Sequence, residues 1–236
     1  MRLTSIVLLL LLVGPAHARA TADQVVLVHG LARSSRSMEP LADFLRAHRL
    51  VVHNVDYPSR EKGPDELVAY LAEAVRECCP PGTGRLHFVT HSLGGILVRQ
   101  LLAQEELPHL GRVVMLAPPN QGSEVIDEWG SWPLFGAVLG PTATELGTAP
   151  DSFPNRIGAP RFELGVIAAR KSANPIGSLL IPGADDGAVS VERARLEGAR
   201  DFIVVDATHT FIMRDHTVAE QVLHFLREGR FVPTTP

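Results

Sequence analysis

The feature that most limits how this chain can fold is a regular alternation of short apolar runs with amphipathic stretches. Each run is rich in β-branched residues and is only as long as a strand that is covered on both faces. The predicted strands are Val25–Val28, Val51–Val55, Leu86–Val89, Val113–Leu116, Phe162–Ala168 and Phe202–Val205. Strands buried in this way need helices on both faces of their sheet.

Apolar residues between the runs recur at the three- and four-residue spacing of helices. One helix is predicted over Leu93–Gln104, another begins near Asp65, which we expect to cap it, and the last ends before Gly229. The other apolar faces consist of Leu41, Phe44, Leu45 and His48, of Leu67, Leu71 and Val75, and of Val218, Val222, Phe225 and Leu226. Because a helix must return the chain between parallel strands, the pattern predicts an α/β fold. We expect a mostly parallel, doubly wound sheet of about six strands flanked by helices.

One long segment, from Pro118 to Pro160, interrupts the alternation. It holds both tryptophans, Trp129 and Trp132, among frequent glycine and proline. A connection of this length usually has a function or some structure of its own, and we expect a short helix that starts at Ser123. The sequence predicts an insertion over residues 118–160. It leaves open whether this insertion is a fixed cap on the core or a mobile apolar lid over a site.

The first twenty residues have the layout of a cleavable secretory signal. Arg2 precedes the apolar run Ile6–Val13, which is followed by the small-residue pattern Ala18-Arg19-Ala20. The run is too short to span a bilayer, which takes about 20 residues, and no later segment is long and apolar enough. We therefore expect cleavage after Ala20, a single mature domain over residues 21–236, and a secreted or periplasmic location.

Charge and motif content exclude several classes of function. The chain has 22 Lys and Arg against 26 Asp and Glu, a formal net charge of -4, and no dense basic run. A nucleic-acid partner is therefore not expected. The sequence has no P-loop and no GxGxxG pattern, and its 10 histidines show neither HExxH nor another metal-ligand spacing. We expect no nucleotide, no organic cofactor and no metal.

The two cysteines, Cys78 and Cys79, are adjacent. Export would permit a disulfide, but neighbouring residues close such a ring only with strain, so the pair does not predict a disulfide framework. Two adjacent thiols are also too few for a structural zinc site. Because Pro80 and Pro81 follow, we interpret the pair as the end of a helix rather than as a redox centre.

A candidate nucleophile, Ser92, lies between the predicted strand Leu86–Val89 and the predicted helix Leu93–Gln104. A serine at a sharp strand-to-helix turn exposes its hydroxyl, and the N–H groups of the helix N-terminus face the same space. The sequence matches GxSxG at Gly94 but departs from it at Thr90, which stands in place of the first glycine. Threonine is small enough for this position, so we interpret Ser92 as catalytic.

A serine hydroxyl is a poor nucleophile until a base takes its proton, and a carboxylate is needed to orient that base. When the serine lies on such a turn, the acid and the base follow after the last two strands, in the order Ser, Asp, His. The predicted acid loop reads Gly183-Ala184-Asp185-Asp186-Gly187. We choose Asp186, because Gly187 behind it permits the tight reversal that turns a side chain inward, and Asp185 is the alternative.

The candidate base after the last strand is His209. His216 and His224 fall at or within the final predicted helix, where packing or solvation is the more common role. Asp206 and Asp215 are close to His209 in the sequence, but they lie outside the expected acid loop and are interpreted as solvated surface residues. The sequence therefore predicts His209 as the third member of the triad.

An oxyanion hole needs two N–H donors near the developing negative charge. One usually belongs to the residue after the nucleophile, here Leu93, and the other to the loop after the first strand, where we choose Leu31. His29 in that loop is expected to make a structural hydrogen bond rather than to act as a base. Arg33 and Arg36 follow in the chain and are expected to be solvated surface charges.

Together these motifs resemble the α/β-hydrolase superfamily, and within it bacterial secreted lipases and esterases. The resemblance covers residues 23–230 and is carried by His29-Gly30-Leu31, His91-Ser92-Leu93-Gly94-Gly95, Asp186-Gly187 and His209. It implies an α/β-hydrolase fold and an enzyme that hydrolyses carboxylic esters through an acyl-enzyme on Ser92, with no organic cofactor. Some lipases of this type bind structural calcium, but no metal site carries over to this chain residue by residue.

The resemblance also implies a partner, which is a small acyl ester or a lipid, with transient contact to lipid interfaces. The same triad would also serve a thioesterase, an amidase or an acyltransferase, and a non-catalytic binding protein could keep the fold. The length of the acyl chain stays open, because one fold supports many chemistries.

Overall fold

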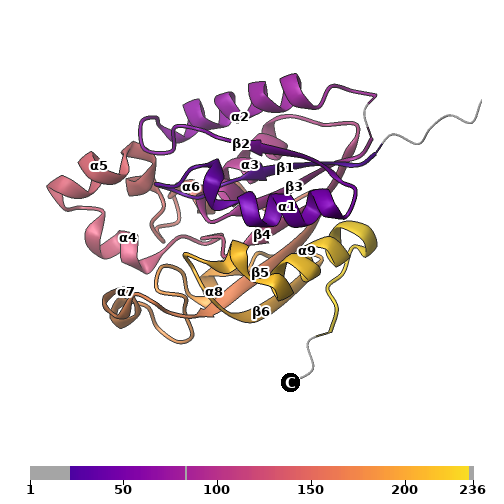
Figure 1. The fold of residues 1–236 in the computed structure, drawn as a ribbon. Helices are drawn as coiled ribbons and strands as arrows, with labels where there is room; N and C mark the ends of the chain where they lie inside the picture. The colour runs from indigo at the N-terminus through magenta and orange to yellow at the C-terminus, as the bar shows by residue number, and fades with distance from the viewer. Residues whose placement is uncertain (1–21, 83, 234–236) are drawn as a thin grey trace, which may run out of the picture.

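Six strands form one parallel sheet in the computed structural model, which describes residues 22–82 and 84–233 (Figure 1). The strands are β1 (Gln24–Val28), β2 (Val51–Val55), β3 (Leu86–His91), β4 (Leu110–Leu116), β5 (Glu163–Lys171) and β6 (Asp201–Thr208). Their order is β2-β1-β3-β4-β5-β6, and every neighbouring pair is parallel. The predicted α/β sheet is confirmed. The chain changes direction across the sheet between β1 and β3, so the loops after these two strands lie side by side.

Helices cover both faces of the sheet. The main ones are α1 (Glu39–Ala47), α2 (Pro64–Cys78), α3 (Leu93–Gln104) and α9 (His216–Glu228). On one face α1 and α9 pack with Val25 and Leu27 of β1, and on the other face α2 and α3 pack with Val26 and Val28. Because successive strand residues point to opposite faces and both faces are covered, β1 is buried along its whole length, and its residues 25–28 form a continuous apolar run.

The last helix, α9, has the boundaries that local rules predict. It ends before Gly229, as expected, and Gly229 has a left-handed φ of 72°. Asp215 precedes the helix, and its carboxylate accepts a hydrogen bond from the N–H of Val218 at 3.1 Å. The interpretation of Asp215 as a solvated surface residue is therefore wrong, because its side chain caps α9.

The start of α2 differs from the prediction. The cap position is Gly63 and not Asp65, which lies inside the first turn. Pro64 takes the first helical position, where its fixed φ suits the helix and its missing N–H costs nothing. The carboxylate of Glu66 accepts from the N–H of Gly63 at 3.2 Å. Asp65 still favours the helix through its charge in the first turn.

The predicted insertion, residues 118–160, joins β4 to β5, and we call it the cap segment. It contains α4 (Glu124–Trp129), α5 (Pro133–Leu139), the 3-10 helix η2 (Pro141–Glu145) and α6 (Phe153–Arg156). As expected, a short helix follows Ser123, which is the residue at the N-cap of α4. α4 and α5 extend beyond the carboxyl ends of the strands (Figure 1). The remaining short helices are η1 (Ser35–Ser37), α7 (Pro175–Leu180), α8 (Val191–Ala194) and η3 (Ile212–Arg214).

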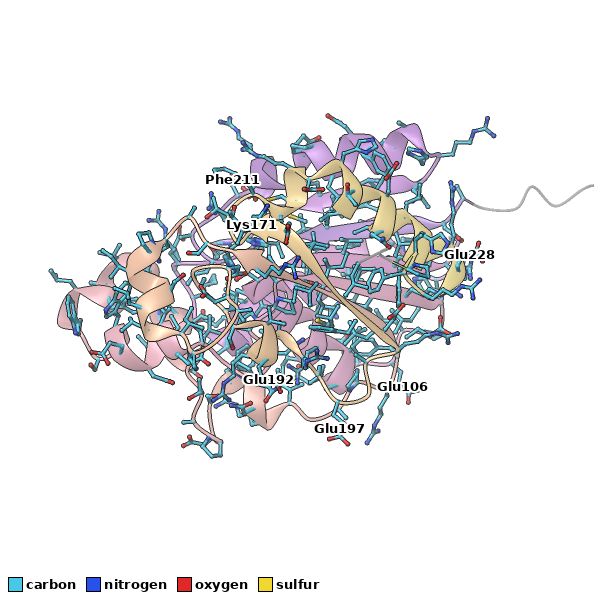
Figure 2. The ribbon with its side chains drawn as sticks, turned by 90° about the horizontal axis from the view of Figure 1, so that it is seen from below. Glu106, Lys171, Glu192, Glu197, Phe211 and Glu228 are labelled. Atoms are coloured by element: carbon cyan, nitrogen blue, oxygen red, sulfur yellow. A yellow bond between two sulfur atoms is a disulfide. The ribbon has the colours of Figure 1, made fainter. Side chains whose placement is uncertain are left out.

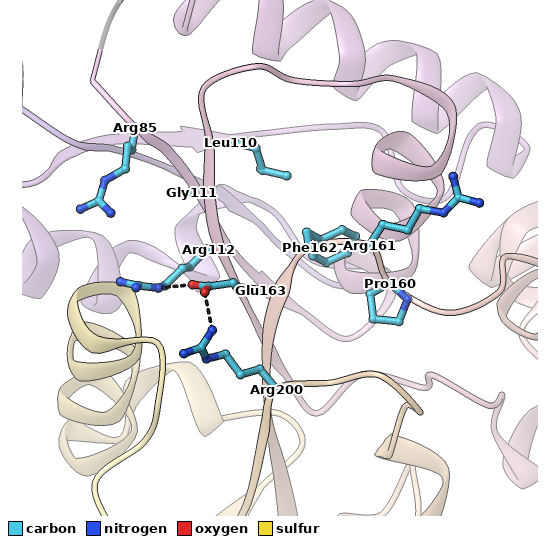
Figure 3. Close-up of a pocket in the computed structure, with 9 residues that line it drawn as sticks. All are labelled: Arg85, Leu110, Gly111, Arg112, Pro160, Arg161, Phe162, Glu163 and Arg200. Atoms are coloured by element: carbon cyan, nitrogen blue, oxygen red, sulfur yellow. Dashed lines mark hydrogen bonds and ion pairs between the residues drawn. The ribbon is translucent and has the colours of Figure 1, made fainter.

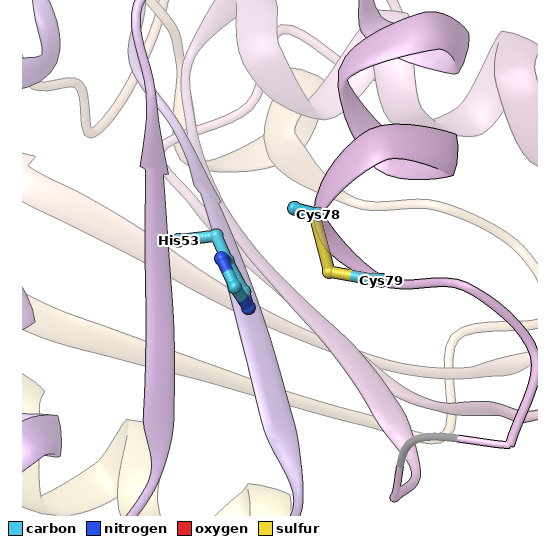
Figure 4. Close-up of side chains that lie close together, drawn as sticks. All are labelled: His53, Cys78 and Cys79. Carbon is cyan, nitrogen blue, oxygen red and sulfur yellow. A yellow bond between two sulfur atoms is a disulfide. The ribbon is translucent and has the colours of Figure 1, made fainter.

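Cys78 is the last residue of α2 and Cys79 follows it, so the predicted helix end is confirmed. The structure also joins their two sulfur atoms in a disulfide (Figure 4). The sequence left the state of these two thiols open, and the structure shows them bonded to each other. The helix ends between them: Cys79 has φ -136° and ψ 58°, outside the helical range, and both side chains point to the same side.

The predicted signal sequence, residues 1–20, and the expected cleavage after Ala20 lie outside the described residues. The start of the mature domain therefore stays a prediction. Within residues 22–82 and 84–233, none of the helices combines the length and apolarity that crossing a membrane requires.

Candidate active site

Ser92 occupies the turn that joins β3 to α3. Its φ of 51° and ψ of -122° are in a region that residues with a side chain rarely adopt, so the backbone is strained at this position. The N–H of Ser92 donates to the carbonyl of Leu116 on β4 at 2.9 Å. This bond ties the strained turn to the neighbouring strand and holds the hydroxyl at the carboxyl edge of the sheet.

Two glycines in the first turn of α3 allow this helix to lie close to the sheet. A Cβ on Gly94 would be 2.6 Å from the carbonyl oxygens of Val28 and His29 at the end of β1. A Cβ on Gly95 would be 3.1 Å from Oγ1 of Thr90. The buried Thr90 therefore fits where the motif has a glycine, because Gly95 leaves space for its side chain.

His209 follows β6 and lies between the other two predicted catalytic residues. Its Nε2 is 3.0 Å from Ser92 Oγ, and its Nδ1 is 2.8 Å from Asp186 Oδ2. Because an ionised carboxylate only accepts, Nδ1 donates its hydrogen to Asp186, and the lone pair of Nε2 faces the serine hydroxyl. The side chains of His209 and Asp186 are 17% and 1% exposed. The structure thus joins three side chains that are distant in the sequence into one hydrogen-bonded chain.

The two neighbouring aspartates of the acid loop have different partners. The second oxygen of Asp186 accepts from the N–H groups of Ala188 and Val189 at 3.0 and 2.8 Å. Asp185 instead accepts from the N–H of Gly187 at 2.7 Å and does not contact the histidine. The chain reverses at Gly187, whose φ of 92° is left-handed, as the choice between the two aspartates assumed.

The other polar candidates lie elsewhere. The side chain of His216, at the start of α9, is 74% exposed, and His224 contacts a backbone carbonyl just beyond the same helix. Asp206 is half exposed and pairs with basic residues at the end of β5. Arg33 and Arg36 are exposed. None of these side chains joins the hydrogen-bonded chain.

Leu31 and Leu93 are the predicted oxyanion donors. Within the described residues, neither of their N–H groups donates to another protein group. Leu93 is the first residue of α3, where an N–H has no acceptor inside the helix. Next to Leu31, Ala32 has a left-handed φ of 55° and donates its N–H to Ser59 Oγ at 3.1 Å. Both donors stay available for a ligand, and their role stays a prediction.

His29 supports the loop that carries Leu31. Its Nδ1 donates to the carbonyl of Gly30 at 2.9 Å, and its Nε2 accepts from the N–H of Tyr57 at 3.3 Å. The Tyr57 hydroxyl donates to the carbonyl of His29 at 2.8 Å, and the two rings stack at 4.1 Å. Burial lowers the pKa of His29, although the Asp56 carboxylate lies 3.4 Å from Nε2. A neutral, structural histidine fits these contacts.

Sequence reasoning missed two buried polar residues near the site, His91 and Arg99. His91 is 2% exposed, and its Nε2 is 2.9 Å from the carbonyl oxygen of His209. Arg99 on α3 is 3% exposed and donates to backbone carbonyls near both ends of the cap segment. Arg99 left a signal, because it follows the apolar run Ile96–Val98 on a helix predicted to pack on the sheet, and a buried polar side chain needs a hydrogen-bond partner. His91 stands between Thr90 and Ser92, and no apolar run marks it.

Large apolar side chains are exposed on segments that leave the carboxyl edge of the sheet. We call them the apolar rim: Trp132, Leu134 and Val138 around α5, Ile176 and Leu179 on α7, and Phe211 after β6. Their exposed fractions range from 50% for Phe211 to 85% for Leu179. Figure 2 shows Phe211 near Lys171 at this edge, with Glu228 at the opposite end. These six exposed side chains are candidates for contact with an apolar ligand or surface.

One cluster in the described part of the chain has the residue types of a metal site. The ligand atoms of His53, Cys78 and Cys79 lie within 4.8 Å of one another (Figure 4). A metal takes thiolates, however, and the two sulfur atoms are bonded to each other. In this state the cluster does not fit a metal.

A hollow at the amino edge of the sheet is lined by several arginines (Figure 3). There Arg112 donates to one oxygen of Glu163 at 2.6 Å, and Arg200 pairs with the other oxygen. Arg112 also donates to two carbonyls at the end of α9. These contacts hold β4, β5 and α9 together at the edge opposite the candidate active site.

A doubly wound parallel sheet with a strained serine between its third strand and the following helix is the architecture of an α/β hydrolase. A model of the alpha/beta hydrolase family matches residues 25–228, and the chain belongs to this family. The resemblance that the sequence motifs indicated is confirmed.

Known proteins of several activities are similar to this chain. It is 30% identical over 129 residues to the human lysosomal thioesterase PPT2, a match that covers 52% of this chain and only 43% of that protein. The mature Bacillus licheniformis lipase BlEst2 superposes with a TM-score of 0.67 at 21% identity, covering 88% of this chain and 92% of the lipase. The Legionella pneumophila phospholipase PlaB gives 0.72 at 17% identity, covering 90% and 60%. At these identities the two structures show the shared fold alone.

Proposed function

We propose that this protein is a serine carboxylic ester hydrolase, a lipase or esterase that acts through an acyl-enzyme on Ser92. One observation carries the proposal: His209 bridges Ser92 Oγ at 3.0 Å and Asp186 Oδ2 at 2.8 Å. A base in this position can take the serine proton while the buried carboxylate fixes its tautomer and stabilises its charged form.

Acylation follows from this geometry. The proton of the Ser92 hydroxyl passes to His209 Nε2 as Oγ bonds to the ester carbonyl carbon, and the carbonyl oxygen becomes an oxyanion. The N–H groups of Leu31 and Leu93, which have no protein acceptor among the described residues, donate to that oxyanion. When the intermediate collapses, the bond to the alcohol oxygen breaks and His209 returns its proton to the leaving alcohol.

Deacylation repeats these steps with water. A water molecule gives a proton to His209 Nε2 and bonds to the acyl carbon, and the bond to Ser92 Oγ then breaks. The serine oxygen takes back the proton, and the carboxylic acid leaves. Asp186 keeps its hydrogen bond to Nδ1 throughout and is not itself protonated.

The apolar rim supports esters with an apolar acyl chain as the substrate class. Its six residues leave the same edge of the sheet at which Ser92 lies, so a chain bound at the serine has apolar surface within reach. Burial of a methylene group contributes about 0.8 kcal/mol, so even a few such contacts favour longer chains. The same surface would make transient contact with a lipid interface.

A thioester is the second candidate substrate. The observation that favours it is the 30% identity to a human thioesterase over 129 residues. The triad would act on a thioester by the same steps, with a thiol in place of the alcohol. A matched pair of acyl oxyester and acyl thioester distinguishes the two, since the better substrate has the higher kcat/KM.

The proposal extends to location and partners. The sequence of residues 1–20 supports export, a mature domain over residues 21–236 and a secreted or periplasmic location. The formal charge of -4 argues against a nucleic acid as the partner. The triad and the apolar rim support a small acyl ester or lipid. A mature protein whose first residue is Thr21, found by N-terminal sequencing after expression with the full leader, tests the export step.

The catalytic proposal is tested by Ser92→Ala together with a fluorophosphonate label. The variant is expected to lower kcat on p-nitrophenyl esters by about 10⁴-fold or more, because the covalent step is lost. In the wild type, the label should attach to Ser92, as read by mass spectrometry of the labelled peptide.

Ser131→Ala is the matched control, because Ser131 is an exposed serine of the cap segment outside the triad. It should retain full activity and labelling. A folded Ser92→Ala protein that hydrolyses esters at the wild-type rate would contradict the proposal. Acyl transfer to an added alcohol, or cleavage of amides alone, would assign the same triad to a different reaction.

A further inference from the structure

His91 is buried at the centre of the candidate active site, although the proposed mechanism gives it no task. It is the last residue of β3 and directly precedes Ser92, and it is 2% exposed. Its ring lies 5.0 Å from the ring of His209, centre to centre. A buried polar side chain needs partners to offset the loss of water, so its contacts indicate what it does.

The contacts of His91 define its tautomer. Nε2 is 2.9 Å from the backbone carbonyl oxygen of His209, and a carbonyl only accepts, so Nε2 carries the hydrogen. Nδ1 has no hydrogen-bond partner within the described residues and faces Gly30. A Cβ on Gly30 would be 2.7 Å from Nδ1, so glycine is needed there to admit the ring.

His91 thereby contacts three of the four loops that form the site, all but the loop of Asp186. It is bonded through the chain to Ser92, it donates to the loop of His209, and it packs on Gly30 in the loop that carries Leu31. The hydrogen bond to His209 matters most, because the other backbone bond of that residue, from its N–H to the carbonyl of Asp186, is long at 3.4 Å.

We propose that His91 is a positioning residue for proton transfer: its Nε2–H holds the backbone of His209 so that the catalytic imidazole stays within reach of Ser92 Oγ. This inference rests on the proposed function. Catalysis of this kind is sensitive to small displacements of the base, because proton transfer needs hydrogen-bond distance between Oγ and Nε2.

The charge state of His91 suits this role. Burial lowers its pKa well below the usual value for histidine, and repulsion from a protonated His209 acts in the same direction, while the hydrogen bond to the His209 carbonyl opposes them. His91 therefore stays neutral while His209 takes the serine proton. It keeps its donor and does not compete as a base.

Three substitutions test the hydrogen bond separately from the volume of the ring. His91→Phe keeps an aromatic ring and removes the donor, and His91→Gln places an amide N–H near the position of Nε2. His91→Asn is shorter and places its amide near the position of Nδ1, out of reach of His209. The measurements are kcat, KM, the melting temperature, and the rate constant for labelling Ser92 with a fluorophosphonate.

We expect His91→Phe and His91→Asn to lower both kcat and the labelling rate by about five- to tenfold, the effect of one hydrogen bond. KM should stay within about twofold, because the contacts of the bound ester are unchanged. His91→Gln should restore both rates to within about twofold of the wild type. If His91 only stabilises the fold, its substitutions lower the melting temperature. The folded fraction is then labelled at the wild-type rate, and His91→Gln gives no recovery.

The outcomes are decisive even if one variant does not fold. If His91→Phe is unfolded, His91→Asn and His91→Gln still differ only in where the amide lies. Wild-type labelling rates in His91→Asn, or equal losses in folded His91→Asn and His91→Gln, would overturn the proposal. A wild-type protein that is not labelled at Ser92 would overturn the proposed function as well. If the wild type is labelled and the His91 variants are labelled at the same rate, this inference alone is overturned.

Discussion

The carboxyl edge of the sheet and the outer part of the cap segment are built in opposite ways. At the edge, Ser92, Asp186 and His209 are held by short hydrogen bonds and by glycines that leave no spare space. In the outer cap, α5 exposes Leu134 and Val138 to 76% and 59%, and within the described residues no hydrogen bond joins α5 to the triad. The difference suits their proposed tasks. Proton transfer needs fixed distances, whereas an apolar chain of variable length needs only apolar surface.

Arg99 connects these two regions. Its Nη1 donates to the carbonyl and to the side-chain oxygen of Asn120 at 3.0 and 3.1 Å. Its Nη2 donates to the carbonyls of Pro154 and Gly158 at 3.3 and 3.0 Å. A single guanidinium on α3, the helix that begins after Ser92, therefore holds both ends of the cap segment. The cap is anchored at its base and exposed at its tip.

The largest effect is expected from a change at the carboxyl edge alone. Asp186→Asn should lower kcat by about 10⁴-fold, because an amide can stabilise the wrong tautomer of His209 and cannot balance the charge of its protonated form. KM and the melting temperature should change little. Steady-state kinetics on a soluble p-nitrophenyl ester measures the effect.

Asp185→Asn is the matched control for that substitution. Asp185 accepts from Ser178 Oγ at 2.5 Å and from the N–H of Gly187, and not from His209. It should retain kcat within about tenfold, since only the shape of the loop is affected. A larger loss in Asp185→Asn than in Asp186→Asn would exchange the roles of the two aspartates.

The next largest effect, a loss of stability, is expected at Arg99, which connects the two regions. Arg99→Met should lower the free energy of unfolding by about 2–4 kcal/mol, because buried carbonyls near both ends of the cap lose their donor. Burial lowers the pKa of Arg99 to about 10, so the side chain is charged at neutral pH and its bonds are charge-assisted. Urea unfolding measures the loss, and hydrogen exchange locates it.

Faster exchange should be concentrated in residues 118–160, while the strands stay protected. Arg161→Met, at an exposed position, is the control and should change the free energy of unfolding by less than about 0.5 kcal/mol. Equal loss of protection across β3 and β4 would show that Arg99 supports the core and not the cap.

A smaller effect on stability is expected when the pH is lowered. It arises from buried histidines of the sheet and its loops, and not from the cap segment. Burial is the largest cause that lowers the pKa values of His29, His87 and His91 below 6.5. Well above pH 6.5 these histidines are neutral in both the folded and the unfolded chain. As the pH falls below 6.5 the unfolded chain takes up protons that the folded chain does not, so stability is lost.

Each buried histidine should contribute up to about 1.4 kcal/mol per pH unit to this loss. Urea unfolding between pH 7.5 and pH 5 measures the slope, which His91→Gln should reduce. His216→Gln should leave the slope unchanged, because the side chain of His216 is 74% exposed. Stability that does not change over this range would contradict the assignment of neutral buried histidines.

The smallest effect is expected at the tip of the cap. Leu134→Ser and Val138→Ser should leave the melting temperature and the hydrolysis of acetate esters unchanged. They should lower kcat/KM for long-chain esters by about three- to tenfold, because apolar contact with the chain is lost. Ala137→Ser, also exposed on α5, is the control for the added hydroxyl. Equal losses on short and long esters would contradict a role of the rim in chain binding.

Much of the fold could be predicted because its signals are local. Each predicted strand run corresponds to a strand, with shifts of a few residues at the ends, since burial on both faces requires uninterrupted apolar sequence. The turn at Ser92 could also be predicted, because the strand, the serine, Gly94 and the helix follow one another in the sequence. The acid and the histidine were located only by chain order and by Gly187, and their meeting with Ser92 depends on the topology of the sheet.

The errors have a common cause. Asp65 was expected to cap α2 and Asp215 to be solvated, but the choice of a cap depends on where the helix meets the rest of the fold. The sequence left the state of Cys78 and Cys79 open, because a bond between them depends on the backbone angles at the end of α2. The partners of His91 lie on the loops of Gly30 and His209, far away along the chain, and no local pattern indicates them.

By itself the sequence determined the alternation of strands and helices, the strained turn at Ser92 and the membership of an α/β class, because periodicity and turn chemistry act over a few neighbouring residues. Only the tertiary structure decided which aspartate faces His209, how His91 holds that histidine, and that Arg99 anchors the cap. These contacts join residues that are brought together by the order of the strands in the sheet, and that order is set by packing over the whole domain.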